Sequence, residues 1–184
     1  MPDLGCSPNA AVAFDFFVNR GLRDYQAAAI IGNLELESRL DSRIVAMDTD
    51  NLPHRGIAMW SPARWDRLLA LASSTGRDPW EIDTQLEFLW YELQTDASLG
   101  LGPLVASPTL ESATVVFQNQ FERPRPDLAH TDRRINYAQV ALFACPAVRP
   151  PKQSLFRTLG AAAGVVALVA AAGYSAYRAR EAWA

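Results

Sequence analysis

The sequence of 184 residues has few of the residues on which several common classes of protein depend. It contains a single lysine, Lys152, two cysteines and two histidines. Two cysteines exclude both a miniprotein built on a disulfide framework and a zinc site with four cysteine ligands. A net charge of −3 argues against a generally basic nucleic-acid binder, because such a protein needs a surface that neutralises phosphates. With 49% hydrophobic residues, the chain is also too apolar to be disordered.

The short motifs of several large enzyme classes are missing too. The sequence has no Gly-x-Ser-x-Gly elbow, no Walker A loop and no Gly-x-Gly-x-x-Gly fingerprint, and no apolar run near Met1 resembles a signal peptide. His54 and His130 stand alone. The segment from Asp48 to Asn51 begins like a calcium loop but continues without the ligand and glycine that such a loop needs. We therefore expect neither a metal nor a cofactor.

Charge and polarity divide the chain near Pro150. Residues 1–150 contain 13 arginines and 19 acidic residues, a net charge of −6, whereas residues 151–184 contain four basic residues and one acidic residue, a net charge of +3. The stretch from Leu159 to Tyr177 is uncharged, and a helix of that length rises about 28 Å, close to the thickness of a bilayer core. Basic residues flank both of its ends. We predict a transmembrane helix over 159–177; the alternative is a buried, alanine-rich core helix.

This division predicts an N-terminal tail (1–10), a helical domain (11–148), a linker (149–158), the transmembrane helix (159–177) and a C-terminal tail (178–184). Cys6 and Cys145 lie near opposite ends of the domain, and chain termini often come close together. They form either a disulfide, in an oxidising compartment, or two buried free thiols.

Most of the domain has the sequence pattern of helices. Four proline pairs predict helix starts, because a Ser or Asp side chain caps the helix and proline fits its first position: Ser7-Pro8, Ser61-Pro62, Asp78-Pro79 and Ser107-Pro108. Apolar stripes follow over 82–93 and 110–121, and a last helix should end before Pro146. Gly76 stands where a helix should end. Between Ser38 and Trp60 the pattern lapses, which predicts loops or a small hairpin. The expected fold is mainly α, either all-α or α+β with a short insert.

Carboxylates are the remaining candidates for chemistry. Residues 24–38 read as a mostly buried helix capped by Asp24, and on a helical wheel Glu37 falls with Asn33 and Leu34. Burial there would disfavour the charged form of Glu37 and raise its pKa, which is what a glycosidase acid needs near neutral pH. Glu35 lies on the other side of this helix. A single glutamate at a helix end is, however, more often an ordinary surface residue.

Four sequence blocks occur in an order that resembles the phage tail lysozyme family. They are GNLELES, GIAMWSPAR, QLEFLWYEL and FERP, and the resemblance covers about residues 11 to 145. The family belongs to a lysozyme-like group that includes goose-type lysozymes and lytic transglycosylases. The resemblance implies a lysozyme-like fold, peptidoglycan as the substrate and Glu37 as the catalytic acid.

The resemblance also implies supporting roles near Glu37. Ser38 would position the end of the helix. Gly56 to Trp60, with Arg64, matches the family's Gly-x-x-Gln-Trp-x-x-x-Arg block, which packs along the sugar cleft. In this sequence Met59 replaces the usual glutamine, so one polar contact to sugar is in doubt.

Later blocks add two more expectations from the resemblance. Gln85 matches the following helix, where a core or supporting role is the default. Phe121 to Pro124 matches the late motif. Arg134 to Tyr137 resembles the Arg-x-x-Tyr of lytic transglycosylase domains, whose tyrosine bonds the catalytic glutamate; Tyr137 is otherwise a core aromatic.

A second catalytic group would have to lie across the sugar from Glu37. Asp48 and Asp50 are the candidates nearest in sequence and could hold a water molecule. If neither reaches the site, Glu37 would act first as acid and then as base and leave an anhydro-muramic product. We favour this lytic-transglycosylase outcome over a hydrolysing lysozyme, because a turn explains residues 48–51.

The sequence thus predicts a muramidase that cuts the β-1,4 bond between N-acetylmuramic acid and N-acetylglucosamine. Its C-terminal span suggests a phage virion protein, held in an internal membrane with other virion proteins, that opens the host wall locally while the genome enters. A prophage- or host-encoded wall-remodelling enzyme is the nearest alternative. A non-catalytic glycan-binding or assembly protein and a membrane-active lysis protein also stay open. No nucleic-acid partner is expected.

Overall fold

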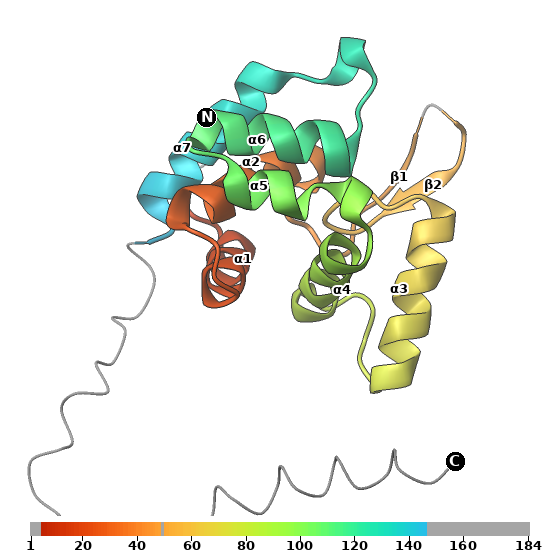
Figure 1. Ribbon diagram of the computed structural model, residues 1–184. Coiled ribbons are helices and arrows are strands. Elements are labelled where there is room, and N and C mark those ends of the chain that lie inside the picture. The colour runs from red at the N-terminus through yellow and green to blue at the C-terminus, as the bar shows by residue number, and fades with distance from the viewer. Residues whose placement is uncertain (1–4, 49, 147–184) are drawn as a thin grey trace, which may run out of the picture. The chain divides into compact units, whose positions relative to one another are not determined.

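The computed structural model describes residues 5–48 and 50–146, and this part of the chain is mainly helical, as predicted (Figure 1). The α-helices are α1 (Pro8–Asn19), α2 (Asp24–Ser38), α3 (Pro62–Thr75), α4 (Ile82–Thr95), α5 (Leu101–Ala106), α6 (Leu110–Phe117) and α7 (Thr131–Ala144), and the strands are β1 (Val45–Met47) and β2 (Pro53–Arg55). Single 3₁₀ turns occupy Ala97–Leu99 and Pro126–Leu128, and a π-helical turn, Gln118–Glu122, directly follows α6.

Helix α2 forms the centre of the domain. Every residue from 27 to 34 is buried, and the helix packs against α1, α6 and α7. Gly32 sets its distance from α7, because a Cβ there would lie 2.5 Å from both the backbone nitrogen of Ala138 and the carbonyl oxygen of Arg134. Any larger residue would force the two helices apart. This close contact brings Arg134 of α7 beside the last turn of α2.

The segment between α2 and α3 forms the small hairpin that the sequence predicted as one of two alternatives. Strands β1 and β2 pair in antiparallel fashion, with Ala46 opposite His54. An isolated bridge between Arg55 and Trp60 extends the pairing into the following loop. Gly56 has a φ of +70°, a left-handed conformation that glycine adopts without steric cost. The hairpin and this loop lie against α3 and α4 in the domain (Figure 1).

Two of the predicted helix starts and one helix end are confirmed. The Ser7 hydroxyl accepts a hydrogen bond from the Ala10 amide at 3.1 Å, and α1 begins at Pro8. Helix α3 begins at Pro62, although the Ser61 side chain makes no capping hydrogen bond, and it ends at Thr75 with the left-handed Gly76 as its C-cap. Helix α2 spans 24–38 as predicted, although Asp24 is its first residue and Arg23 is the capping residue.

The other two predicted starts were wrong by two or three residues. Helix α4 begins at Ile82, because the Asp78 carboxylate accepts a hydrogen bond from the Trp80 amide and closes a turn instead of capping a helix. Helix α6 begins at Leu110, since the side chain of Thr109, and not that of Ser107, caps it. In both cases a local side-chain bond competed with the helix start that proline suggested.

The two cysteines form a disulfide between residues that flank the first and last helices. Cys6 precedes α1, Cys145 follows α7, and their Cα atoms lie 5.0 Å apart. Of the two alternatives that the sequence left open, the disulfide is therefore the one present, and the pair of free thiols is not. The bond links residues 139 positions apart and so closes almost the whole domain into one loop.

The predicted transmembrane helix at 159–177 and the linker before it lie outside the described residues, as does most of the N-terminal tail. Within residues 5–48 and 50–146, no helix is both long enough and apolar enough to cross a bilayer.

Candidate functional site

A polar cleft of about 360 Å³ opens where α2, the hairpin, α3, the π turn and α7 meet. Several of the residues predicted from the sequence line it, and the structure adds others. The charged side chains of the cleft are Glu37, Asp48, His54, Arg64, Glu122, Arg123, Arg125 and Arg134. Met59 and Ser61 complete one wall. Acids and bases thus face the same space, which is the arrangement that acid–base chemistry on a polar substrate requires.

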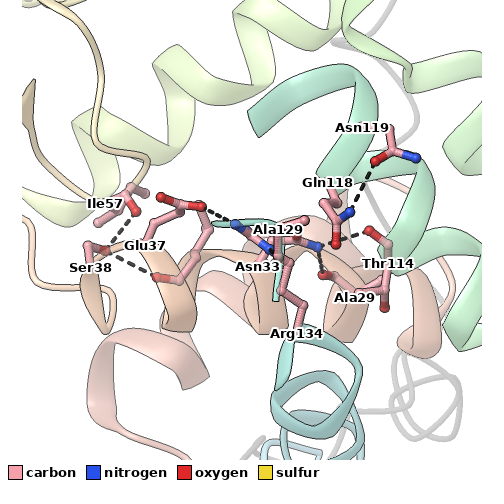
Figure 2. Close-up of polar contacts among 11 residues, drawn as sticks. Ala29, Asn33, Glu37, Ser38, Ile57, Thr114, Gln118, Asn119, Ala129 and Arg134 are labelled. Carbon is pink, nitrogen blue, oxygen red and sulfur yellow. Dashed lines mark hydrogen bonds and ion pairs between the residues drawn. The ribbon is translucent and has the colours of Figure 1, made fainter. Parts of the chain in front are cut away.

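Glu37 stands in the last turn of α2 and makes a close ion pair with Arg134 of α7. Its Oε1 atom accepts a hydrogen bond from an Arg134 guanidinium nitrogen at 2.6 Å, and 22% of the glutamate side chain remains exposed (Figure 2). Arg134 is almost fully buried. Its Nε donates to the carbonyl oxygen of Ala129 at 2.8 Å, and a further nitrogen donates to Asn33 Oδ1 at 3.0 Å. Three contacts therefore hold the guanidinium, and one of them is the ion pair.

Asn33 fixes this arrangement from one helical turn below Glu37. Its amide nitrogen donates to the carbonyl oxygens of Ala29 at 2.8 Å and of Thr114 at 3.2 Å, so its own oxygen faces Arg134 (Figure 2). The backbone of α6 thereby orients Asn33, Asn33 orients Arg134, and Arg134 orients Glu37. The helical wheel placed Asn33 and Glu37 on one face, but it could not identify the arginine between them.

Ser38 and Gln85 hold the loop that follows the hairpin. The Ser38 hydroxyl donates to the carbonyl oxygen of Ile57 at 2.7 Å, and the Ile57 amide donates to Gln85 Oε1 at 2.9 Å. A Cβ at Gly56 would lie 2.7 Å from that same amide oxygen, so the glycine allows the loop to pass close to Gln85. Both polar side chains are buried. Their contacts position the wall of the cleft.

Trp60 and Arg64 contact a buried acid, Glu92 of α4. The indole nitrogen of Trp60 donates to Glu92 at 2.9 Å, and Arg64 makes a bidentate pair with it at 3.0 and 2.7 Å. Trp60 is fully buried, so it supports the wall and offers no face to a ligand. The Arg64 guanidinium lies over the Phe121 ring, 4.6 Å from its centroid, which joins α3 to the π turn.

The hairpin places Asp48 and Asp50, the two candidates for a second catalytic group, in different surroundings. Asp48 lines the cleft, whereas Asp50 is exposed, is not among the residues that line it, and bonds to His54 at 3.1 Å. This bond and the Leu52 amide hold the pKa of Asp50 below its usual value. Burial alone would lower the pKa of His54, but the bonds to Asp50 and to the Met59 carbonyl, with the charges of both aspartates, raise it overall.

Tyr137 lines a different pocket, which has a volume of about 260 Å³ and lies beside the disulfide. The Tyr137 hydroxyl lies 3.5 Å from an Arg133 nitrogen. Within the Arg134–Tyr137 motif, it is the side chain of Arg134, and not that of Tyr137, that contacts Glu37. Glu35 lines this second pocket together with Tyr137. Burial raises the pKa of Glu35, and the charge of Arg39 opposes that shift.

Glu122 is a cleft residue that sequence reasoning did not single out. It ends the π turn and lines the cleft, and its Oε1 atom is buried with no hydrogen-bond partner among the described residues. Burial raises the pKa of Glu122 well above its usual range, and the charge of Glu37 adds to that shift, against Arg134 and Arg64. The sequence feature that could have identified Glu122 is its position in the Phe121–Pro124 block. The π turn that orients its side chain, however, has no recognisable sequence pattern.

The chain matches a known protein family. The model of the family described as phage tail lysozyme matches residues 8–143, close to three quarters of the chain. The matched range includes every residue that lines the cleft, from Glu37 to Arg134. It also agrees with the resemblance drawn from the four sequence blocks. No curated protein matches the chain.

Proposed function

Because the chain belongs to the phage tail lysozyme family, we propose that it is a muramidase that cuts the β-1,4 bond between N-acetylmuramic acid and N-acetylglucosamine. Family membership supports a peptidoglycan-degrading, lysozyme-like function, and the bond and the mechanism are our proposal. One observation carries it: Glu37 lies in the last turn of a buried helix and opens onto a polar cleft that is lined by carboxyl groups, arginines and a histidine.

Glu37 would act as the general acid. Arg134 holds Oε1, and the described residues make no such contact with Oε2, which is therefore the oxygen available to substrate. Because Arg134 is itself held by Asn33 and Ala129, the carboxylate has little freedom to turn away. Fixed geometry of this kind supports proton transfer to a glycosidic oxygen.

For the second step we propose the lytic-transglycosylase outcome, in which Glu37 then acts as base and the sugar's own hydroxyl attacks. Asp50 bonds to His54 and lies outside the cleft lining, which supports this choice. Asp48 does line the cleft and is the residue that could hold a water molecule in a hydrolysing enzyme. Mass spectrometry of the released muropeptides distinguishes the two outcomes, because anhydro and hydrolysed ends differ by one water.

The test is a pair of isosteric variants on one helix. Glu37→Gln should lose wall clearing by about 100-fold or more, since the amide keeps the contact with Arg134 but has no proton to give. Glu35→Gln, two residues earlier and on the other pocket, should keep full activity. Thermal unfolding of both variants checks that they are folded. Full lytic activity of Glu37→Gln would refute the proposal.

Peptidoglycan binding without turnover by the wild-type protein would instead identify a glycan-binding protein. Met59, which lines the cleft where the family has glutamine, is the feature that favours this second candidate. Restoring the glutamine with Met59→Gln should then raise glycan affinity without producing cleavage.

We also propose that residues 159–177 anchor the enzyme in a membrane of the virion, where it would open the host wall locally while the genome enters. The uncharged, bilayer-length run with basic flanks supports this assignment. Deleting residues 155–184 should abolish sedimentation with vesicles and leave wall-cutting in solution unchanged. A membrane-active lysis protein would lose all of its effect.

A further inference from the structure

We propose that Glu122 and Glu37 together hold one proton that the cleavage reaction uses. The inference rests on the proposed muramidase function and deepens it. It gives Glu122 a role in holding the proton of Glu37, a different role from that of Asp48 across the sugar.

The π turn places Glu122 in the cleft and keeps it there. A π turn adds one residue to the helical ring and so rotates the side chains that follow it. Phe121 remains in the core, where its ring stacks on that of Phe117, with centroids 4.6 Å apart. Arg123 follows the turn and donates hydrogen bonds to the carbonyl oxygen and hydroxyl of Ser98 at 3.1 and 3.0 Å. With both neighbours fixed, Glu122 has a defined place on the cleft wall.

Four charged groups from four helices act on Glu122. They are Glu37 of α2, Arg64 of α3, Glu92 of α4 and Arg134 of α7. Each arginine is already paired with another glutamate: Arg134 with Glu37 at 2.6 Å, and Arg64 with Glu92 at 2.7 Å. Three carboxyl groups therefore share two guanidinium groups. Unless one carboxyl group holds a proton, the cluster carries an excess negative charge in the partly buried wall of the cleft.

The remaining charged groups near the cleft do not neutralise this excess. Arg67 is more than half exposed and reaches Glu92 at 3.9 Å. Arg125 pairs with Asp127 at 3.0 Å. On the hairpin, Asp48 and His54 face each other at 3.7 Å. Arg123 also lines the cleft but is exposed, and each of the other groups has a partner of opposite charge or is exposed to solvent as well.

The proton is held mainly by Glu122, for two reasons. Glu92 accepts three hydrogen bonds from Trp60 and Arg64, and Glu37 accepts one from Arg134, so each already has a charged donor. Glu122 Oε1 is buried without a partner, and a charged oxygen in that position would be costly. Burial and the nearby charge of Glu37 accordingly raise the pKa of Glu122.

The reaction then proceeds with all protons accounted for. The shared proton passes to Glu37, and as the bond between the sugar's C1 and the glycosidic oxygen breaks, Glu37 gives it to that oxygen. Both glutamates are then ionised, and the charge of Arg134 stabilises that state. When water or the sugar's own hydroxyl attacks C1, its proton returns to the pair. Glu122 acts through Glu37 in this scheme, so we class it as a positioning residue.

Glu122→Gln tests the proposal in the full-length protein, with Glu111→Gln on the exposed face of α6 as the matched control. We expect kcat for wall cleavage to fall by about 100-fold or more, with KM little changed. The alkaline limb of the residual pH–activity profile should move to lower pH, because the proton then has one carboxyl group fewer to hold it. Glu122→Asp should restore part of the activity and of the alkaline limb. The control should match the wild-type protein.

A second measurement needs no substrate. When a carboxyl group has a higher pKa in the folded state than in the unfolded state, the unfolded state loses its proton at a lower pH. The free energy of unfolding of the wild-type protein should therefore fall, relative to that of Glu122→Gln, as the pH rises above the ordinary value of 4.5. A stability difference that does not change with pH would overturn the inference.

The outcomes separate the two proposals. If the wild-type protein cuts walls and Glu122→Gln is equally active with the same alkaline limb, the inference about Glu122 fails and the proposed function stands. The inference also fails if activity falls but neither the pH profile nor the pH dependence of stability changes, since the residue is then only structural. If the wild-type protein does not cut walls, the proposed function fails, and the stability measurement still decides where the proton lies.

Discussion

Reduction of the disulfide between Cys6 and Cys145 should destabilise the domain by about 5 kcal/mol. The magnitude follows from the 139 residues that separate the two cysteines. In the chain-entropy treatment, a closed loop of that size removes about 17 cal/mol/K from the unfolded chain, which is about 5 kcal/mol at room temperature. For a domain of this size, such a loss lowers Tm by roughly 15 °C.

The assay is urea unfolding, followed by tryptophan fluorescence, with and without a thiol reductant. Trp60 and Trp65 are buried and report on the core. The double variant Cys6→Ser/Cys145→Ser should match the reduced wild-type protein and be insensitive to reductant. Wall cutting at low temperature should survive, because neither cysteine lines the catalytic cleft. Equal unfolding midpoints for the oxidised and reduced protein would refute the reasoning.

Three further predictions test the packing and the electrostatics. Gly32→Ala should lower the free energy of unfolding by about 3 kcal/mol and reduce activity, because its Cβ would collide with the α7 backbone; Gly102→Ala, which meets no atom within 4 Å, should not. Glu92→Gln should cost about 3 kcal/mol in a denaturant titration, since it leaves the half-buried Arg64 guanidinium without its counter-charge. The wild-type protein should have a higher free energy of unfolding than His54→Gln, fully so below pH 6.5 and less as the pH rises through the raised pKa of His54. Denaturant unfolding of both proteins at pH 6 and pH 9 measures this difference, and a difference that is the same at both pH values would contradict the prediction.

Local sequence determined the features that depend on a few neighbouring residues. Helix α2 covers the predicted residues 24–38, so the helical pattern alone was enough to place Glu37 near its end. Ser7 and Gly76 cap helices for the same reason, because capping is a matter of a few bonds within one turn. The hairpin fell within the stretch where the helical pattern lapses. Where a competing local bond existed, as at Asp78, the predicted start was displaced.

Tertiary structure decided which side chains surround Glu37. Arg134 lies 97 residues away in sequence and reaches Glu37 because Gly32 lets α7 pack closely on α2. Glu122 enters the cleft through a π turn that is set by the packing around Phe121, and Trp60 is turned into the core by its bond to buried Glu92. Spacing along the chain predicts contacts within a helix, whereas these contacts depend on how closely helices approach. The sequence by itself therefore identified a candidate acid, and the packing of α2, α6 and α7 supplied the charges that set its chemistry.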